Sequence, residues 1–376
     1  MIDVGVVAGE ASGDLLGSHF IRALKQHHPA LRAAGIAGPR LVEAGVTAIY
    51  PSEKLAVNGY VEVLRHLPEL LWIRARIARH FLAERPRVFV GIDAPDFNFA
   101  LEARLKAAGI PVVHFVSPSI WAWRPERIHR IRQAVSRMLV VFPFEEAIYR
   151  DAGVPVTFVG HPLADVIPLA PDTAAARTAL GLAAGPVFAL LPGSRLSEVK
   201  RHARLMLDAA RLILARRPDA QFVLPAAGAA AAALIGQAGG GHGLPLTVLA
   251  GQSHAALAAC DVALVASGTA TLEAALFKKP MVITYRVPAL TARLMRKQAL
   301  QPWIGLPNIL AGEFVVPERV QEAATAENLA HDALAWLDDA PRRAAVADRF
   351  HDLHLSLRQN AAARIADALA PYLAGA

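Results

Sequence analysis

The chain repeats one pattern throughout: a short run of apolar, β-branched residues, a turn of small residues, and a stretch with helical periodicity. The clearest runs are Val4–Ala8, Val88–Ile92 and Val187–Leu191. Strands that alternate with helices predict parallel sheets in an α/β protein. The other expected strands are Gly35–Gly38, Thr47–Tyr50, Pro111–Val116, Met138–Val141, Val156–Val159, Phe222–Pro225, Leu246–Leu249, Asp261–Ala266 and Met281–Arg286.

The length of the chain predicts two domains, because 376 residues exceed one ordinary core. A stretch rich in Pro, Ala and Thr from Ile167 to Ala176 is interpreted as the linker between them. Each half would form its own parallel sheet, and the two domains would face each other across a cleft. The tail from Glu327 to Leu373 is expected to be helical, and the Ala/Gly tract from Ala226 to Gly243 is given no chemical role.

The composition excludes a disordered chain, because 54% of the residues are hydrophobic and 19% are charged. The net charge of +7 points to an anionic partner: nucleic acid, a phosphorylated metabolite or an anionic membrane. Nucleic acid is not expected, since the arginines are scattered over helices and no binding module is recognisable.

Four further features narrow the class of protein. The one cysteine, Cys260, cannot form an internal disulfide, which fits a reducing compartment. The first residues include Asp3 and no basic stretch, so a strand is expected there and not a signal peptide. No apolar stretch reaches the roughly 18 residues that span a bilayer, so any membrane association would be peripheral. No H-E-x-x-H, cysteine cluster or D-x-D pair is present, so no metal or other cofactor is expected.

The stretch VFALLPGSRLSEVKR, residues 187–201, predicts a strand, a tight turn and the start of a helix. Ser197 is expected to cap that helix. A helix N-terminus attracts phosphate, and the guanidinium of Arg195 suits phosphate oxygens, with Ser194 beside it in the turn. An ordinary βα turn with a surface arginine fits this stretch equally well.

A second turn of the same kind follows the run Asp261–Ala266. Ser267, Gly268 and Thr269 offer small hydroxyls and free N–H groups that suit a diphosphate. Glu273, one turn into the helix, can accept two hydrogen bonds from a vicinal diol such as that of ribose. The two turns together favour a nucleotide-diphosphate site over two structural turns.

In the first half, Asp93 directly follows the run Val88–Ile92, where loops of a parallel sheet line the ligand crevice. A carboxylate there can act as a general base. Asp96 is expected to cap the following helix or to support the site. The loop after the next strand carries Trp121, Trp123 and Arg124, which offer stacking and anion contact, although core packing of either tryptophan is the alternative.

Two more segments of the first half each fit two alternative roles. The turn Gly9–Asp14 lacks the Walker and G-x-G-x-x-G patterns, so it is either structural or faces a substrate. A helix is expected to begin at Pro68, with Leu71 and Trp72 off its apolar stripe and surrounded by arginines. Such a face suits a membrane or an acylated anionic ligand, and a solvated helix face is the alternative.

These motifs together resemble the lipid-A-disaccharide synthase family, in the same order from residue 3 to near the C-terminus. The matching blocks are GEASGD (9–14), GIDAPDFN (91–98), SPSIWAWRPERI (117–128), LPGSRLSEV (191–199), ASGTATLE (266–273) and LPNILAGE (306–313). The resemblance implies the GT-B fold with two Rossmann-like domains. It also implies an inverting, metal-independent glycosyltransferase that joins UDP-2,3-diacylglucosamine to 2,3-diacylglucosamine 1-phosphate.

By the same resemblance, Asp93 would be the general base and Arg195 would neutralise the departing UDP. The residues that would bind UDP or substrate are Ser12, Gly13, Trp123, Arg124, Ser194, Ser267, Gly268, Thr269, Glu273 and Asn308. Domains are expected at 1–166 and 167–349, with 350–376 packing back on the first. The implied setting is the cytoplasmic face of the inner membrane of a Gram-negative bacterium, and a homodimer is a further possibility.

The lipid contact is expected around Val57–Leu71, although Asn58 stands where an apolar residue would be expected. A rival enzyme with the same fold is a UDP-N-acetylglucosamine 2-epimerase, which would act on soluble sugar nucleotide alone. The tryptophan loop and the Val57–Leu71 segment argue against it. A two-domain ligand-binding protein is disfavoured because such proteins are usually exported.

Overall fold

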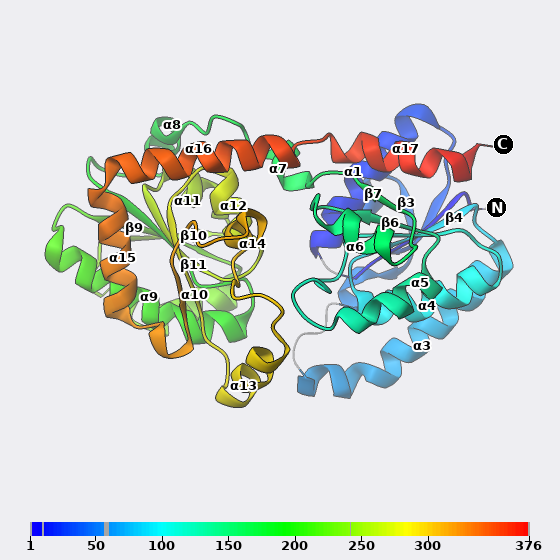
Figure 1. The fold of residues 1–376 in the computed structure, drawn as a ribbon, viewed down its shortest axis with the longest axis horizontal. Coiled ribbons are helices and arrows are strands. Elements are labelled where there is room, and N and C mark those ends of the chain that lie inside the picture. The colour runs from blue at the N-terminus through cyan, green and yellow to red at the C-terminus, as the bar shows by residue number, and fades with distance from the viewer. Residues whose placement is uncertain (1, 10, 56–59, 241, 375–376) are drawn as a thin grey trace. The chain divides into compact units, whose positions relative to one another are not determined.

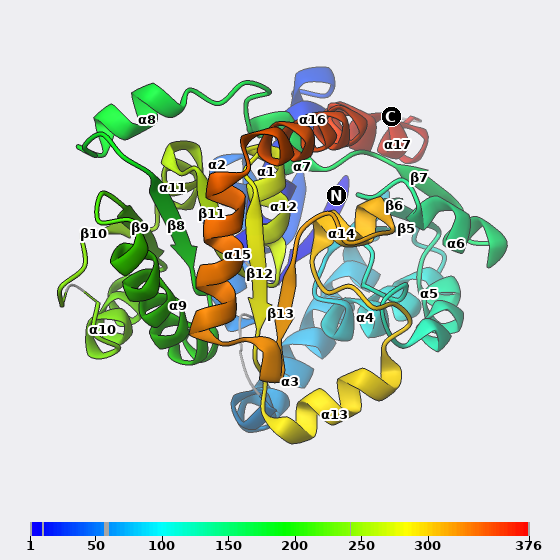
Figure 2. The same ribbon diagram turned by 60° about the vertical axis from the view of Figure 1, so that its left-hand side comes forward.

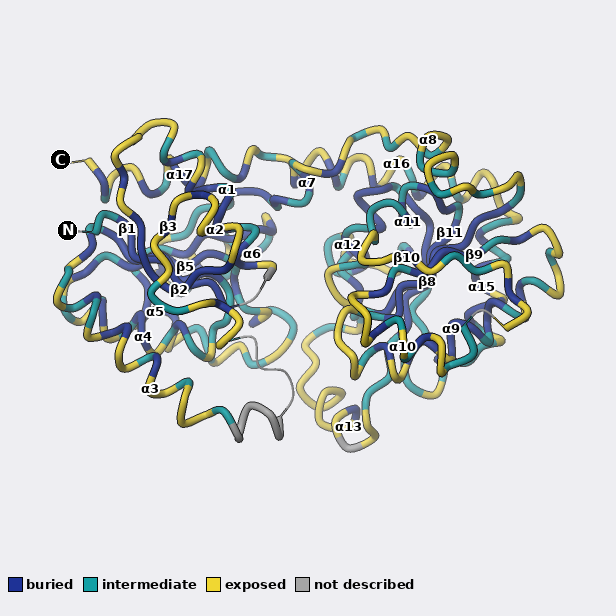
Figure 3. Tube along the Cα trace, turned by 180° about the vertical axis from the view of Figure 1, so that it is seen from behind, coloured by how far each residue is buried: buried dark blue, intermediate teal, exposed yellow. Residues whose placement is uncertain are grey.

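The computed structural model describes residues 2–9, 11–55, 60–240 and 242–374. This part of the chain divides into two compact units: unit 1 is Met1–Asp165 with Leu357–Ala376, and unit 2 is Val166–Ser356. Each unit is built on one parallel sheet with helices on both faces (Figure 1). The expected α/β class is therefore confirmed. The sheets form the buried centre of each unit, dark blue in Figure 3.

The sheet of unit 1 has seven described strands in the order β3-β2-β1-β4-β5-β6-β7, and all neighbours pair in parallel. The strand order reverses between β1 and β4. In open α/β sheets, ligands bind outside the carboxyl ends of the strands at this point. The strands are β1 (Val4–Ala8), β2 (Ala33–Ala37), β3 (Val46–Pro51), β4 (Val88–Ile92), β5 (Val112–Phe115), β6 (Arg137–Val140) and β7 (Val156–Phe158).

The helices of unit 1 cover the sheet on both faces. Helices α1 and α17 lie on one face, and α3, α4 and α5 lie on the other (Figure 1). The helices are α1 (Ala11–His27), α2 (Pro39–Glu43), α3 (Tyr60–Glu84), α4 (Pro95–Ala107), α5 (Ile128–Ala134), α6 (Glu145–Asp151) and α17 (Ala361–Leu373), and α7 (Pro162–Val166) ends at the boundary between the units.

The sheet of unit 2 has six described strands in the order β10-β9-β8-β11-β12-β13, again parallel, and reverses between β8 and β11. Strand β13 was not predicted, because three residues with two charges show no apolar run. The strands are β8 (Val187–Leu191), β9 (Gln221–Ala226), β10 (Leu246–Ala250), β11 (Val262–Ala266), β12 (Met281–Tyr285) and β13 (Glu318–Val320).

In unit 2, helices α9, α10 and α15 cover one face of the sheet, and α8, α11 and α12 cover the other (Figure 2). The fully buried Trp336 of α15 donates its indole N–H to the carbonyl of Met281 in β12, at 3.1 Å. The helices are α8 (Thr173–Ala179), α9 (Leu196–Arg216), α10 (Ala229–Gln237), α11 (Ser253–Ala259), α12 (Thr269–Leu276), α13 (Ala289–Gln298), α14 (Leu306–Ala311), α15 (Ala326–Asp338) and α16 (Ala340–Leu357).

Several local expectations were wrong. Helix α3 begins at Tyr60, so Pro68 lies inside it and not at its start. Residues 306–310 were expected to form a loop after a strand, but they belong to helix α14. Pro307 stands in the first turn of this helix, where a missing N–H costs nothing. Helix α1 begins at Ala11, so Ser12 and Gly13 belong to a helix and not to a turn.

The segment expected to contact lipid is described only in part. Val57 and Asn58 lie outside the described residues, as do the side chains of residues 60–65. The stripe expected on α3 is Leu70, Ile73, Ile77 and Phe81. Its last three members are buried and Leu70 is half-buried, while Leu71 and Trp72 are exposed. Among the described helices, none is long and apolar enough to cross a membrane.

Candidate active site

In unit 1, Asp93 lies at the carboxyl end of β4, beside the reversal of strand order. Asp93 and Ala94 both have left-handed backbone angles, with φ of +50° and +45°, which non-glycine residues rarely adopt. The N–H of Asp93 donates to the carbonyl of Phe115 at 2.9 Å, and the buried amide of Asn98 donates to the carbonyl of Asp93 at 2.8 Å. The surrounding structure thus holds the carboxylate on a strained turn, a feature that clusters at functional sites.

The carboxylate of Asp93 is itself available. Its side chain is partly exposed. Within the described part of the chain, no hydrogen bond or ion pair engages it. A carboxylate without an internal partner is able to accept a proton from a hydroxyl group placed within hydrogen-bond reach.

Asp96 does not cap α4, because the residue that precedes the helix is Ala94. Its exposed carboxylate accepts from the guanidinium of Arg127 at 3.1 Å. The guanidinium groups of Arg127 and Arg124 lie over the ring of Trp123, at 5.5 and 4.4 Å from its centroid. Asp96 therefore supports the arginine–tryptophan cluster after β5.

The two tryptophans of this loop have different environments. Trp121 donates its indole N–H to the carboxyl of Glu145 at 3.0 Å and packs edge-on against Phe144. Glu145 is buried, which raises its pKa to about 7. Trp123 is 41% exposed. Trp121 therefore anchors the loop, and Trp123 is an exposed aromatic ring with two guanidinium groups near it.

A buried polar pair behind the Asp93 turn was not predicted. Glu102 of α4 and His114 of β5 are fully buried, with 2.6 Å between Oε1 and Nδ1, and burial raises the pKa of Glu102. A Cβ on Gly91 would lie 1.9 Å from Glu102 Oε1, so only glycine fits there. Glu102 pairs with a residue of another element, so no local spacing in the sequence indicated this pair.

On the neighbouring strand β1, the following turn packs closely against the Asp93 turn. A Cβ on Gly9 would lie 2.6 Å from Cβ of Ala94, and a Cβ on Gly13 would lie 3.4 Å from Ile92 Cγ2. A side chain at Gly13 would thus make only ordinary contact with Ile92, whereas one at Gly9 would collide with Ala94. Ser12 is exposed in the first turn of α1, so its hydroxyl remains accessible.

In unit 2, the first candidate turn joins β8 to α9. Arg195, and not Ser197, directly precedes the helix. The Glu198 carboxylate accepts from the backbone N–H groups of Ser194 and Arg195, both at 3.2 Å, and its other oxygen lies 3.3 Å from the Arg195 guanidinium. Gly193 has φ of +118°, and a Cβ there would lie 2.5 Å from Glu198. The fold thus holds a carboxylate on the N–H groups that were predicted to bind phosphate.

The second turn joins β11, the parallel neighbour of β8, to α12. Gly268 has φ of +153°, no atom within 4 Å of an added Cβ, and an exposed neighbour in Thr269. The Ser267 hydroxyl already donates to the carbonyl of Ile304 at 2.7 Å. Glu273 is mostly buried, which raises its pKa, and its Oε2 lies 3.8 Å from His254 Nε2. The backbone at Gly268 and Thr269 is therefore accessible to a ligand, whereas the Ser267 hydroxyl is already engaged.

Asn308 has a structural role. It is fully buried, and its amide donates to the Val316 carbonyl at 2.9 Å and to Glu318 at 2.8 Å. Its oxygen accepts from the N–H groups of Val315 and Val316, at 2.8 and 3.0 Å. Every hydrogen-bonding position of its amide is used to fix the segment after α14, and the place of Asn308 near the donor stays a prediction.

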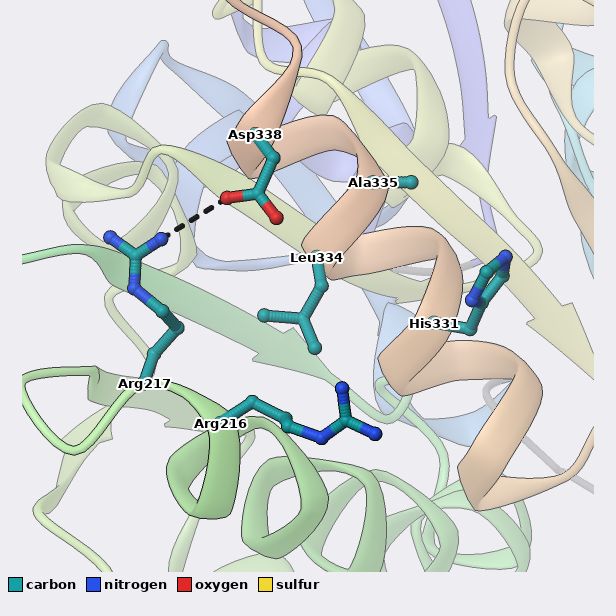
Figure 4. Close-up of a pocket in the computed structure, with 6 residues that line it drawn as sticks. All are labelled: Arg216, Arg217, His331, Leu334, Ala335 and Asp338. Atoms are coloured by element: carbon teal, nitrogen blue, oxygen red, sulfur yellow. Dashed lines mark hydrogen bonds and ion pairs between the residues drawn. The ribbon is translucent and has the colours of Figure 1, made fainter.

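A cavity of about 380 Å³ lies elsewhere in unit 2, between the last turn of α9 and α15 (Figure 4). Arg217 and Asp338 form an ion pair of 3.1 Å at its edge. Since α9 starts at the carboxyl edge of the sheet, its last turn lies at the opposite edge from the two candidate turns. This cavity is not part of the candidate site. Among the described residues, no group of His, Cys, Asp and Glu could hold a metal ion.

Comparison with solved structures identifies the fold. A UDP-GlcNAc 2-epimerase from Neisseria meningitidis bound to UDP-GlcNAc matches with a TM-score of 0.68 at 13% identity, covering 98% of this chain and 99% of that one. The glycotransferase of kitacinnamycin matches with a TM-score of 0.62 at 16% identity, covering 98% of each chain. The predicted GT-B fold is confirmed.

Comparison of sequences identifies the family. The family model for lipid-A-disaccharide synthetase matches residues 4–370. A lipid-A-disaccharide synthase from Thiobacillus denitrificans is 77% identical over 99% of this chain and all of its own length. One from Methylobacillus flagellatus is 51% identical over the same shares. The chain therefore belongs to the lipid-A-disaccharide synthase family and is a glycosyltransferase with a role in lipid A disaccharide synthesis.

Proposed function

We propose that this enzyme condenses UDP-2,3-diacylglucosamine with 2,3-diacylglucosamine 1-phosphate. The products are the β-1,6-linked disaccharide 1-phosphate and UDP. The observation that carries the proposal is the full-length identity of 77% to a lipid-A-disaccharide synthase. The free carboxylate of Asp93 at one switch point and the two turns at the other supply the chemistry that this reaction requires.

The transfer is a single displacement with inversion. The acceptor 6-hydroxyl oxygen attacks the anomeric carbon of the donor, and the bond between that carbon and the diphosphate oxygen breaks. The hydroxyl proton passes to the Asp93 carboxylate, and UDP leaves with the electron pair. Asp93 fits this role because its turn is held rigidly while its carboxylate has no partner among the described side chains.

The negative charge that develops on UDP needs fixed positive partners. Arg195 supplies a guanidinium, and the N-terminal turns of α9 and α12 supply backbone N–H groups, with Ser194, Gly268 and Thr269 nearest. In this role, the diphosphate replaces the Glu198 carboxylate at the Ser194 and Arg195 amides. Glu273 would accept from the ribose diol, and Ser267 would contribute through its backbone, since its hydroxyl is engaged.

The acceptor carries a sugar ring and a phosphate, and the cluster after β5 fits both. The Trp123 ring suits stacking against a sugar face, and Arg124 and Arg127 suit the phosphate. Ser12 is a further exposed hydroxyl at the same edge of the sheet, and Gly13 follows it in the first turn of α1.

Both substrates carry acyl chains, so we propose peripheral attachment to the cytoplasmic face of the inner membrane. Exposed Leu71 and Trp72 on α3, beside Arg74 and Arg76, support this setting, because apolar residues flanked by arginines suit an anionic interface. A homodimer stays a prediction.

The reaction is tested by incubating purified protein with both lipid substrates in EDTA and following UDP and disaccharide by mass spectrometry. The proposal expects product in EDTA, because protein groups neutralise the diphosphate. It also expects one UDP for each disaccharide, because one transfer releases one UDP. A parallel reaction with soluble UDP-N-acetylglucosamine and no lipid is the control. Turnover of that sugar nucleotide, without disaccharide in the main reaction, would replace the proposal with the epimerase function.

A further inference from the structure

Helix α13 of unit 2 is almost entirely exposed. Among its residues with described side chains, only Ala292 is buried. Leu294 and Met295 are 53% and 51% exposed, and Leu300, two residues beyond the helix, is 54% exposed. Large apolar side chains that contribute nothing to the core of their own unit call for another partner.

The helical geometry directs these side chains outward. Successive residues of an α-helix are about 100° apart, so Leu294 points about 160° away from the buried Ala292. Met295 lies about 60° from Ala292, on the flank of the same exposed surface.

The charge of this segment has one sign. From Arg286 to Leu300 the chain has four basic residues and no acidic one. Arg296 is paired with Glu322 at 2.6 Å. Arg293 and Lys297 have no partner among the described residues and stand one turn apart. Lys297 also lies one turn from Leu294, so charged and apolar groups share one exposed surface.

We propose that α13 is an interfacial helix that lies in the headgroup region of an anionic bilayer. Leu294, Met295 and Leu300 would enter the acyl boundary, and Arg293 and Lys297 would contact anionic headgroups. Short helices with an exposed apolar surface and unpaired basic residues bind in this way. The inference rests on the membrane setting proposed above and adds to it a second attachment element, on the unit that carries the nucleotide turns.

The environment of α13 can be measured with a fluorophore attached to one introduced cysteine. Its one cysteine, Cys260, is fully buried, which raises the pKa of its thiol to about 11, so it should not react with thiol dyes. A single introduced cysteine can therefore carry a polarity-sensitive fluorophore. The test variant is Met295→Cys, and the matched control is Leu212→Cys, on an exposed position of α9 in the same unit. Trp72→Cys reports on the α3 surface.

The three labelled proteins are mixed with phosphatidylcholine vesicles that either contain or lack phosphatidylglycerol. The Met295→Cys label is expected to shift to the blue, brighten several-fold and be quenched by brominated acyl chains, only with the anionic vesicles and less at high salt. The Leu212→Cys label should not respond. The Leu294→Ser/Met295→Ser variant should bind vesicles more weakly, with unchanged turnover of detergent-dispersed substrates.

Three results would overturn the inference. If the Trp72→Cys label inserts and the Met295→Cys label behaves like the α9 control, the membrane setting stands and α13 is not part of it. If the Met295→Cys label responds to protein concentration without vesicles, the partner of α13 is a second copy of the chain. Insertion of neither label would remove the membrane setting together with this inference.

Discussion

Glu145 of α6 is a buried carboxyl in unit 1 that supports the loop after β5. Its carboxyl accepts from the Trp121 indole and from the Phe142 N–H, and both bonds hold the loop that presents Trp123. Burial outweighs these bonds and raises the pKa of Glu145 from 4.5 to about 7. The folded protein therefore keeps this proton at pH values where the unfolded chain has released it.

The sign of the pH dependence follows from the raised pKa. Between pH 4.5 and about 7, the unfolded state loses the Glu145 proton first, so stability falls as the pH rises. Glu145→Gln cannot titrate. Its free energy of unfolding, relative to wild type, should rise from pH 4.5 to 8 by up to about 3 kcal/mol. Urea unfolding at both pH values measures this, and a difference that does not change with pH would contradict it.

At the residue scale, the sequence identifies candidate site residues by their position directly after a strand. It does not show which side chains from different elements contact each other. Asp93 was identified because it follows an apolar run directly. Glu102 and His114 lie on different elements and meet only when α4 packs on β5, so no local pattern shows that they pair. Asn308 was assigned to the ligand, although its four hydrogen bonds are internal.

At the scale of elements, the turn between β8 and α9 is the most informative. The sequence pattern correctly predicted a strand, a glycine turn and a helix. It did not reveal that Glu198 folds back onto the amides of Ser194 and Arg195, since the distance between them depends on the Gly193 backbone. The turn is therefore formed and already occupied by an internal anion.

Because Glu198 occupies these amides, it is expected to compete with the diphosphate of UDP for them. If a diphosphate takes the place of the Glu198 carboxylate, Glu198→Gln should bind UDP about two- to five-fold more tightly, since an exposed charge interaction amounts to roughly 0.5–1 kcal/mol. Asp208→Asn, which removes another carboxylate of α9 that is paired with Arg204 and Arg211, should leave the affinity unchanged. Titration calorimetry measures both. Weaker UDP binding by Glu198→Gln would show that the carboxylate holds the turn in its binding shape.

At the scale of the whole molecule, the chain crosses between its units twice and finishes in the unit where it began. Helix α17 packs against α1, and Arg87 donates to the carbonyl of Leu373 at 3.0 Å. The strand pattern in the sequence indicated two sheets, but only the resemblance suggested that the tail returns. Contacts between residues far apart in sequence leave no local periodicity.

The returning tail should contribute directly to the stability of unit 1. Leu369 on α17 is fully buried, so Leu369→Ala should cost about 2–5 kcal/mol. Leu355→Ala on α16 removes the same atoms from a position that is 47% exposed, and should change stability by less than about 0.5 kcal/mol. Urea unfolding compares the two variants. Equal, small losses would mean that α17 is not part of the core of unit 1.

The most direct test of the proposed mechanism measures both turnover and UDP binding of one variant, Asp93→Ala. Asp93 supplies the base in unit 1, and the nucleotide turns belong to unit 2. Asp93→Ala should therefore lower kcat about 10²–10⁴-fold, the usual contribution of a general base, and leave the Kd for UDP unchanged. Turnover of Asp93→Ala at the wild-type rate would contradict the assignment of the base, and with it the proposed mechanism.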